Sequence, residues 1–402
     1  MRIATQIVGA FLALLGVAVV VVCLANTRRD AGCDFNLRMN ELSCLRSGVD
    51  PFHVWNETVA LRPYVSNSHK GDRPEGCDRQ VNAYVPWEYA MMLPLSFLPR
   101  NAAWWTYFAC LILCWLIVHR IGTRTDRFPL AAHAALMVVA YPLFSDLQIG
   151  NFATIVLTAS VLMAWFLNWG SDLVAGFCWS VAMVKPQLAI LLAVPLIMRR
   201  KWRTGVVAAG TCVLLSFVPK LYCKSGFLDL LRAGPAANVE FFQGCGTCPY
   251  WFCSWASSEV CIGVGLLIGF LLCVGMTFAI RRERDWFVLL MPAAVCGCTW
   301  SYAHSYCHAM GWFLAFVLVR ELVRNPQSKF LWVMLGLSVF ALSRWFLAWH
   351  GLCAFAGWRF PMSEYAFRCV DSLNSTASLA LAAVFCVWKS RNVTVVSALW
   401  RF

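Results

Sequence analysis

The chain has 402 residues, of which 60% are hydrophobic and only 13% are charged. A soluble domain carries about 25% charged residues, so this composition excludes an ordinary soluble protein. The formal net charge of +13 would suit nucleic-acid binding, but the cationic residues lie in short clusters between apolar runs, which argues against it. We therefore expect an all-α, polytopic helical membrane protein, formed as one integral membrane domain over residues 1–402.

The first predicted membrane span covers residues 4–26, which contain no charged residue. About 20 apolar residues are enough to cross a bilayer. The run is longer than the ~7–15-residue core of a secretory signal, and no clean A-x-A cleavage site follows it. We interpret it as an uncleaved first helix whose N-terminus is cytoplasmic.

The segment that follows, residues 28–101, is the only long polar stretch of the sequence. It contains nine basic and nine acidic residues, so the rest of the chain supplies the whole positive surplus. A long neutral loop after a cytoplasmic N-terminus and one crossing lies on the opposite face. We expect residues 28–101 to be an extracytoplasmic loop.

The surplus Lys and Arg residues fall in five clusters, and such clusters in short loops mark the cytoplasmic side of a membrane. The clusters are Arg120/Arg124/Arg127, Arg199/Arg200/Lys201/Arg203, Arg281/Arg282/Arg284, Arg320/Arg324/Lys329 and Lys389/Arg391. If all five are cytoplasmic, each interval between them holds an even number of crossings.

The apolar stretches after the first loop satisfy this rule. They cover residues 102–119, 128–147, 151–169, 173–184, 188–198, 204–222, 258–280, 286–303, 309–322, 330–350 and 372–388. Together with the first helix they predict about twelve transmembrane segments and a cytoplasmic C-terminus. Residues 223–257 then form a second extracytoplasmic loop.

Lys185 and Pro186 interrupt the apolar stretch between residues 173 and 198. A single kinked helix there would leave an odd number of crossings, so the chain must turn at this point. At ~1.5 Å per residue, neither flanking segment reaches across a ~30 Å hydrocarbon core. We expect Lys185 at an outward-facing turn sunk inside the protein, where irregular backbone is tolerated.

By this topology, residues able to do chemistry collect on the extracytoplasmic face. They are Asp34, Gln148, Asn151, Lys185, His304 and His308. Each has a structural alternative: the acid can cap a helix, and the amides can bond backbone at a helix end. Lysine near membrane depth costs roughly 3 kcal/mol on insertion scales, which makes Lys185 a functional candidate unless it pairs with an acid such as Asp146. The two histidines would bind metal only with a shared helix and a third ligand, so we predict no metal site.

Several short motifs appear in a consistent order along the chain. They are Asp34-Phe35, Gly48-Val49-Asp50-Pro51-Phe52, Tyr84-Val85-Pro86-Trp87, the Leu93–Pro99 stretch, Gln148-Ile149-Gly150-Asn151, Lys185-Pro186, Arg199-Arg200-Lys201-Trp202 and Ser301-Tyr302 with Tyr306. In this order and spacing, over about residues 30–310, the chain resembles glycosyltransferase family 87, the polyprenol-phosphate-mannose-dependent mannosyltransferases of the GT-C fold.

The resemblance implies a chemistry. A hexose such as mannose would pass from a polyprenyl-phosphate donor to a hydroxyl of a glycan or glycolipid acceptor, with inversion, in a bacterial cytoplasmic membrane. Asp34 would act as general base, and Lys185 would stabilise the leaving phosphate. Donor or substrate binding would fall to Gln148, Asn151, Asp50, Tyr84, His304 and His308. No cofactor is expected, since no dinucleotide or P-loop pattern occurs.

Two other classes of function remain open from the sequence. A transporter or flippase for a lipid-linked sugar would more often show internal repeats, and none is visible. A structural or assembly membrane protein would explain the helices but neither the acid-rich first loop nor Lys185.

Overall fold

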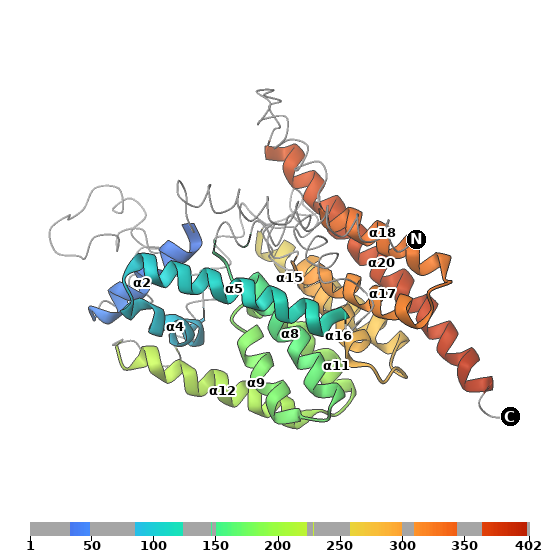
Figure 1. Cartoon of the computed structure of the whole chain (residues 1–402), viewed down its shortest axis with the longest axis horizontal. Helices are drawn as coiled ribbons and strands as arrows, with labels where there is room; N and C mark the ends of the chain where they lie inside the picture. The colour runs from blue at the N-terminus through green and yellow to red at the C-terminus, as the bar shows by residue number, and fades with distance from the viewer. Residues whose placement is uncertain are drawn as a thin grey trace, which may run out of the picture.

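The computed structural model describes residues 33–48, 85–123, 146, 150–222, 228, 258–299, 309–343 and 364–399. Within these ranges the chain is helical with short turns and has no β-strand, which confirms the all-α prediction. The helices (Figure 1) are α2 (Cys33–Arg46), α4 (Pro86–Met92), η2 (Leu93–Phe97), α5 (Arg100–Thr123), α8 (Ala153–Asn168), α9 (Asp172–Ala182), α10 (Pro186–Ala189), η3 (Ile190–Leu192), α11 (Ala193–Met198), α12 (Trp202–Lys220), α15 (Ser258–Ala279), α16 (Trp286–Thr299), α17 (Trp312–Arg324), α18 (Lys329–Ser343) and α20 (Glu364–Leu399).

Two of the described helices are long and apolar enough to cross a membrane. They are the Arg100–Val118 part of α5 and Trp202–Lys220, which is α12, each with 19 residues. The other apolar helices in the same ranges are shorter, with 10–17 residues, although most of them coincide with predicted spans. The count of about twelve spans therefore stays a prediction.

The outer surface of these helices is apolar. On α12, Val206 is 72% exposed and Leu214 is 70% exposed, and Trp105 on α5 is 52% exposed. Large apolar side chains exposed on several long helices are typical of a surface that contacts a membrane or another protein. This surface fits a protein embedded in lipid better than one surrounded by water.

Helix α16 forms the centre of the bundle. Every residue from Trp286 to Thr299 is buried, which is expected of a helix that is hydrophobic all round. It packs against α8, α15, α17 and α20. Gly297 lets α16 lie directly against the backbone of α10, because a Cβ at that position would lie only 2.4 Å from the backbone oxygen of Leu188.

A network of charged side chains joins the helices at one end of the bundle. Asp285, just before α16, lies 3.1 Å from Nη2 of Arg320 and 2.9 Å from Nη2 of Arg324, both on α17. Its Oδ1 also accepts a hydrogen bond of 3.0 Å from the side-chain amide of Asn168, the last residue of α8. Burial alone would raise the pKa of Asp285, but Arg320 and Asn168 outweigh it and hold that pKa below its ordinary value. The network ties α8, α16 and α17 together.

Two further contacts bring other cationic clusters to this end. Lys389 of α20 lies 2.7 Å from the carboxylate of Glu321. Arg199 donates a hydrogen bond to the backbone oxygen of Glu283. These contacts bring residues of three predicted cationic clusters to one end of the bundle. A fourth cluster lies there too, because Glu283 stands between its members Arg282 and Arg284. Figure 1 shows α2 and α4 at the opposite end, at the left of the view. Which end faces the cytoplasm stays a prediction.

Candidate functional site

Helix α2 carries Asp34 in its first turn, where a negative charge is favoured by the helix dipole. Two arginines fix the helix against the segment that leads into α5. Nε of Arg100 donates to Oδ1 of Asn36 at 3.0 Å, and Nη1 of Arg46 donates to the backbone oxygen of Ser96 at 2.5 Å. The position of Asp34 is thus set by contacts near both ends of its helix.

The turn before α8 is organised by the fully buried Asp146. Its carboxylate accepts hydrogen bonds from the backbone N–H groups of Ala153 at 3.2 Å and Thr154 at 2.8 Å. These are among the first N–H groups of a helix, which have no partner inside it. The backbone oxygen of Asp146 accepts from the N–H groups of Gly150 and Asn151. This closed turn places Asn151 directly before α8.

Gly150 allows α2 and α5 to approach this turn. Its φ of +74° lies in the left-handed region, which glycine adopts without steric cost. A Cβ there would lie 2.7 Å from Cβ of Phe35 and 2.8 Å from the ring of Trp104. Both the backbone conformation and the packing therefore require glycine at this position.

Asn151 connects the turn to Asp34. Its side-chain amide nitrogen donates a hydrogen bond to Oδ2 of Asp34. The orientation of the amide is fixed on its other side, because Oδ1 accepts the N–H of Phe152 at 2.7 Å. The backbone oxygen of Asn151 accepts from the hydroxyl of Tyr107 at 2.7 Å. A fully buried amide with these contacts holds the Asp34 carboxylate in one place.

Lys185 lies in the turn between α9 and α10, with a side chain only 2% exposed. As predicted, the chain reverses here inside the protein. The indole N–H of Trp87 in α4 donates to the backbone oxygen of Met183 at 3.0 Å, so a helix of the first loop packs on this turn. Lys185 lies close enough to Asp146 and Glu88 to act electrostatically on both carboxyl groups. The site of Lys185 therefore adjoins the turn that carries Asn151.

A second group of charged residues, which sequence reasoning missed, is buried between α2 and α4. Arg38 forms an ion pair with Glu41, and its Nε lies 3.9 Å from Oε1 of Glu88. The hydroxyl of Tyr89 donates to Oε2 of Glu41 at 2.9 Å. All four side chains are at most 4% exposed. We call Arg38, Glu41, Glu88 and Tyr89 the α2–α4 cluster.

The two acids of the α2–α4 cluster hold their protons more tightly than free carboxyl groups do. Burial raises the pKa of Glu41, and the charge of Arg38 lowers it only in part. Burial raises the pKa of Glu88 well above its ordinary value, against the opposing charges of Arg38 and Lys185. Neither carboxyl oxygen of Glu88 has a hydrogen-bond partner in the described part of the chain. Glu88 is thus suited to keep its proton to a higher pH than a free glutamate does.

One signal in the sequence could have revealed part of this cluster. Asp34, Arg38 and Glu41 are spaced by four and three residues, which places them on one face of a helix. Three charges on one face, together with Glu88 in the later Trp87-Glu88-Tyr89, suggest a polar contact between the two segments. Sequence reasoning interpreted this region as a polar loop leading into a span.

The structure places three of the predicted site residues. Asp34 and Asn151 are in contact, and Lys185 lies at the neighbouring turn. The remaining candidates lie outside the described residues; they are Gln148, Asp50, Tyr84, His304 and His308. Within the described ranges, no three His, Cys, Asp or Glu side chains are grouped so that they could hold a metal ion. The predicted absence of a metal at the histidines is not tested by this.

In chemical terms, a fixed and partly accessible carboxylate stands near a buried ammonium group at one end of a helical bundle. Comparison with known proteins adds a family to this geometry. The family model described as glycosyltransferase family 87 matches residues 82–302, more than half of the chain. Glu88, Asn151 and Lys185 lie within the match, and α2 with Asp34 precedes it. No curated protein and no solved structure matches the chain.

Proposed function

Because the chain belongs to glycosyltransferase family 87, we propose that this glycosyltransferase moves a hexose such as mannose from a polyprenyl-phosphate donor to a hydroxyl of a glycan or glycolipid acceptor. The observation that carries the proposal is the contact between Asp34 and Asn151 beside Lys185, which brings an acid and a cation to the same end of the bundle. The apolar outer surface supports a donor whose tail stays in the membrane.

In the proposed reaction the acceptor oxygen attacks the anomeric carbon, and the bond from that carbon to the phosphate oxygen breaks. The phosphate leaves with the bonding electron pair, so the configuration at the anomeric carbon inverts. Asp34 takes the proton that the hydroxyl loses, which is general base catalysis. Asn151 acts as a positioning residue, because its amide nitrogen donates to Oδ2 of Asp34 and keeps the carboxylate oriented.

The leaving phosphate gains negative charge as its bond breaks, and a preorganised cation stabilises that charge. Lys185 has the right charge and lies at the turn beside Asn151. Its interactions with Asp146 and Glu88 also support the alternative that it only balances buried acids. In our proposal Glu88 stays protonated and therefore uncharged, so that the ammonium group of Lys185 interacts mainly with the phosphate. The raised pKa of Glu88 supports this assignment.

We further propose that this end of the bundle is extracytoplasmic. The cationic residues at the opposite end support that orientation under the positive-inside rule. Membership of a glycosyltransferase family favours transfer over transport of the lipid-linked sugar.

The test is a transfer assay with purified full-length protein, polyprenyl-phosphate-mannose and a panel of glycan and glycolipid acceptors. We expect a new glycosidic product with inverted configuration from the wild type, and roughly 10²–10⁴-fold slower formation of it by Asp34→Asn. Transfer that proceeds equally well from a nucleotide sugar would overturn the donor assignment. Retention of configuration in the product would overturn the single-displacement mechanism.

A further inference from the structure

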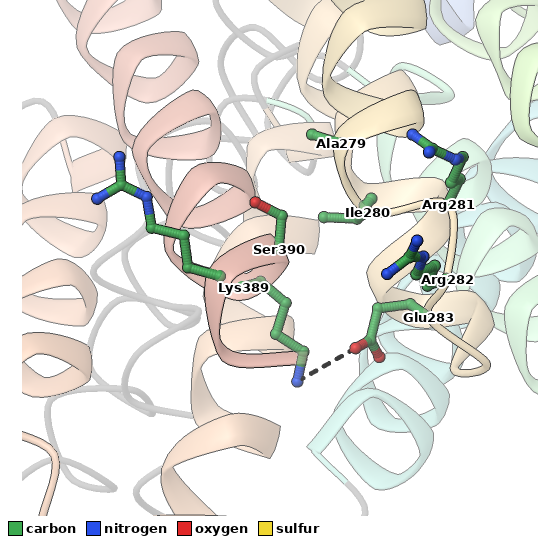
Figure 2. A pocket seen from close by; sticks show the side chains of 8 residues that line it. Ala279, Ile280, Arg281, Arg282, Glu283, Lys389 and Ser390 are labelled. Carbon is green, nitrogen blue, oxygen red and sulfur yellow. Dashed lines mark ion pairs between the residues drawn. The ribbon is translucent and has the colours of Figure 1, made fainter. Parts of the chain in front are cut away.

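A cavity of about 290 Å³ lies among the cationic residues, away from the proposed active site. It is formed by the end of α15, the loop after it and the C-terminal part of α20. The lining residues are Ala279, Ile280, Arg281, Arg282, Glu283, Lys389, Ser390 and Arg391. Figure 2 shows Arg281, Arg282 and Glu283 on one wall, with Lys389 and Ser390 facing them from α20.

The lining carries four cations and one acid, a surplus of three positive charges. Lys389 is already engaged, since its Nζ lies 2.7 Å from Glu321 and 3.8 Å from Glu283. No carboxylate in the described ranges lies within ion-pair distance of Arg281, Arg282 or Arg391. The uncompensated charge of the lining residues therefore comes from three arginines, Arg281, Arg282 and Arg391.

Three of the lining side chains, Lys389, Glu283 and Arg281, are held in place by contacts within the protein. The pair between Lys389 and Glu283 links the two walls, as the dashed line in Figure 2 marks. The guanidinium of Arg281 stacks 3.8 Å from the ring centre of Phe278, and its Nη1 donates to the backbone oxygen of that residue at 3.2 Å. A preorganised guanidinium loses less entropy when it binds a ligand.

The chemistry of the lining selects a phosphate. Guanidinium groups present N–H donors in a planar fork that matches the oxygens of a phosphate, and charge-assisted hydrogen bonds of this kind are strong. A space of about 290 Å³ is at the lower limit for a small-molecule site and holds a phosphate with a small substituent.

The surroundings of the cavity point to a lipid as the source of that phosphate. Exposed apolar side chains stand on both helices beside the cavity, with Phe278 53% exposed on α15 and Val384 and Val387 each 49% exposed on α20. An apolar surface that changes to a cationic one within two turns is typical of the level where lipid headgroups lie. Acyl chains could follow the apolar faces of α15 and α20 while the headgroup phosphate enters the cavity.

We propose that this cavity binds the phosphate of an anionic membrane phospholipid. The site belongs to the opposite end of the bundle from α2 and α4 (Figure 1), so it is separate from the proposed active site and does not depend on it. A lipid bound there would contact both α15 and α20, which also pack on each other directly.

The test uses full-length protein purified in a neutral detergent, with bound lipid measured by native mass spectrometry during titration with phosphatidylglycerol. The Arg282→Gln/Arg391→Gln double variant removes two exposed guanidinium groups of the lining. The matched control is Arg203→Gln, an exposed arginine of another cationic cluster that does not line the cavity. A thermal unfolding curve without lipid checks that each variant is folded, and Arg282→Gln alone replaces the double variant if that one does not fold.

We expect the double variant to bind phosphatidylglycerol at least about tenfold more weakly than the wild type, with the control unchanged. Phosphatidylcholine should bind the wild type more weakly, because its headgroup carries no net charge. Equal binding of phosphatidylglycerol to wild type and double variant would overturn the proposal. Displacement of the lipid by glycerol 3-phosphate at similar concentration would also overturn it, and would assign the cavity to a soluble phosphate ester.

Discussion

The side-chain amide of Asn151 donates a hydrogen bond to the carboxylate of Asp34, although 117 positions separate the two residues in the chain. The contact joins the first turn of α2 to the turn before α8. Two residues that the sequence offered as separate candidates thus form one arrangement, in which the amide orients the acid. The functional predictions below depend on this arrangement and on its neighbour Lys185.

Asp34→Asn tests the proposed general base. Asparagine keeps the shape and an oxygen that can accept from Asn151, but it cannot take a proton at neutral pH. We expect turnover in the transfer assay to fall by roughly 10²–10⁴-fold, the usual contribution of general base catalysis, with donor binding less affected.

The matched control for that variant is Asp172→Asn at the other end of the bundle, where Asp172 pairs with Lys201 at 2.7 Å. This partly exposed pair contributes little to stability, so transfer should stay close to wild type. Near-normal turnover of a folded Asp34→Asn enzyme would exclude Asp34 as the base, and Asp50 would be the next candidate.

Lys185→Met separates phosphate binding from charge balance. Removing one partner of a buried ion pair costs about 3–5 kcal/mol, because the remaining charge is left in a low dielectric. If Glu88 stays protonated, as we propose, adding Glu88→Gln to Lys185→Met removes no charge, so we expect the double variant to recover little of any lost thermal stability; much recovery would mean that Lys185 balances an ionised Glu88. If Lys185 serves the donor phosphate, transfer should remain abolished in both variants.

Two outcomes decide the role of Lys185, with thermal unfolding and transfer measured on the same samples. Lys185→Arg should keep stability and restore only part of the transfer rate, because a guanidinium has a different shape from a compact ammonium. Recovery of normal transfer in the Lys185→Met/Glu88→Gln double variant would show that Lys185 only balances the charge of Glu88.

The sequence predicted the apolar helices well because their signal is local, whereas α2 and α4 lie in a segment that was interpreted as a polar loop. The apolar stretches 204–222 and 258–280 correspond to α12 (Trp202–Lys220) and α15 (Ser258–Ala279). The reversal at Lys185 had another basis, because it followed from the rule that each interval between cationic clusters holds an even number of crossings. The last helix is longer than expected, because α20 continues as a regular helix through residues on both sides of the predicted span 372–388.

Burial of the charged residues could not be predicted in the same way. Arg38 and Glu41 belong to a polar stretch of α2, and only their contact with Glu88 and Tyr89 of α4 removes them from solvent. Such a contact joins segments about 50 positions apart, and no local pattern encodes it. The family match begins after α2, so it does not include Arg38 or Glu41.

Glu88→Gln tests whether the α2–α4 cluster holds an extra proton. The folded pKa of Glu88 is raised by burial above its unfolded value of about 4.3. Below that unfolded value both states are protonated, and ionisation costs the fold nothing. As the pH rises from the unfolded to the folded pKa, the unfolded state ionises while the buried carboxyl keeps its proton, so the wild type loses stability relative to Glu88→Gln.

Thermal unfolding of both proteins across pH 4–9 checks this, with the difference between the two unfolding temperatures as the readout. We expect the glutamine variant to gain on the wild type steadily as the pH rises. A constant difference over the whole range would mean that Glu88 has the same pKa in the folded and unfolded protein. A difference that moves in the opposite direction would mean that Arg38 and Lys185 outweigh burial.

Gly150→Ala tests the close packing that brings Asp34 to Asn151, and Gly170→Ala is its matched control. The two glycines have nearly the same φ, +74° and +76°, so both substitutions carry a similar conformational cost of roughly 1–2 kcal/mol. At Gly170 no atom lies within 4 Å of an added Cβ, whereas at Gly150 the added Cβ would collide with Phe35 and Trp104. Overpacking of this kind costs about 1–3 kcal/mol in addition.

We expect Gly150→Ala to lower the unfolding temperature clearly more than Gly170→Ala, and to lower transfer as well, because α2 must move away from Asn151. Equal effects of the two substitutions on stability and on transfer would show that the approach of α2 to this turn is not tight and that the Asp34–Asn151 contact does not depend on it.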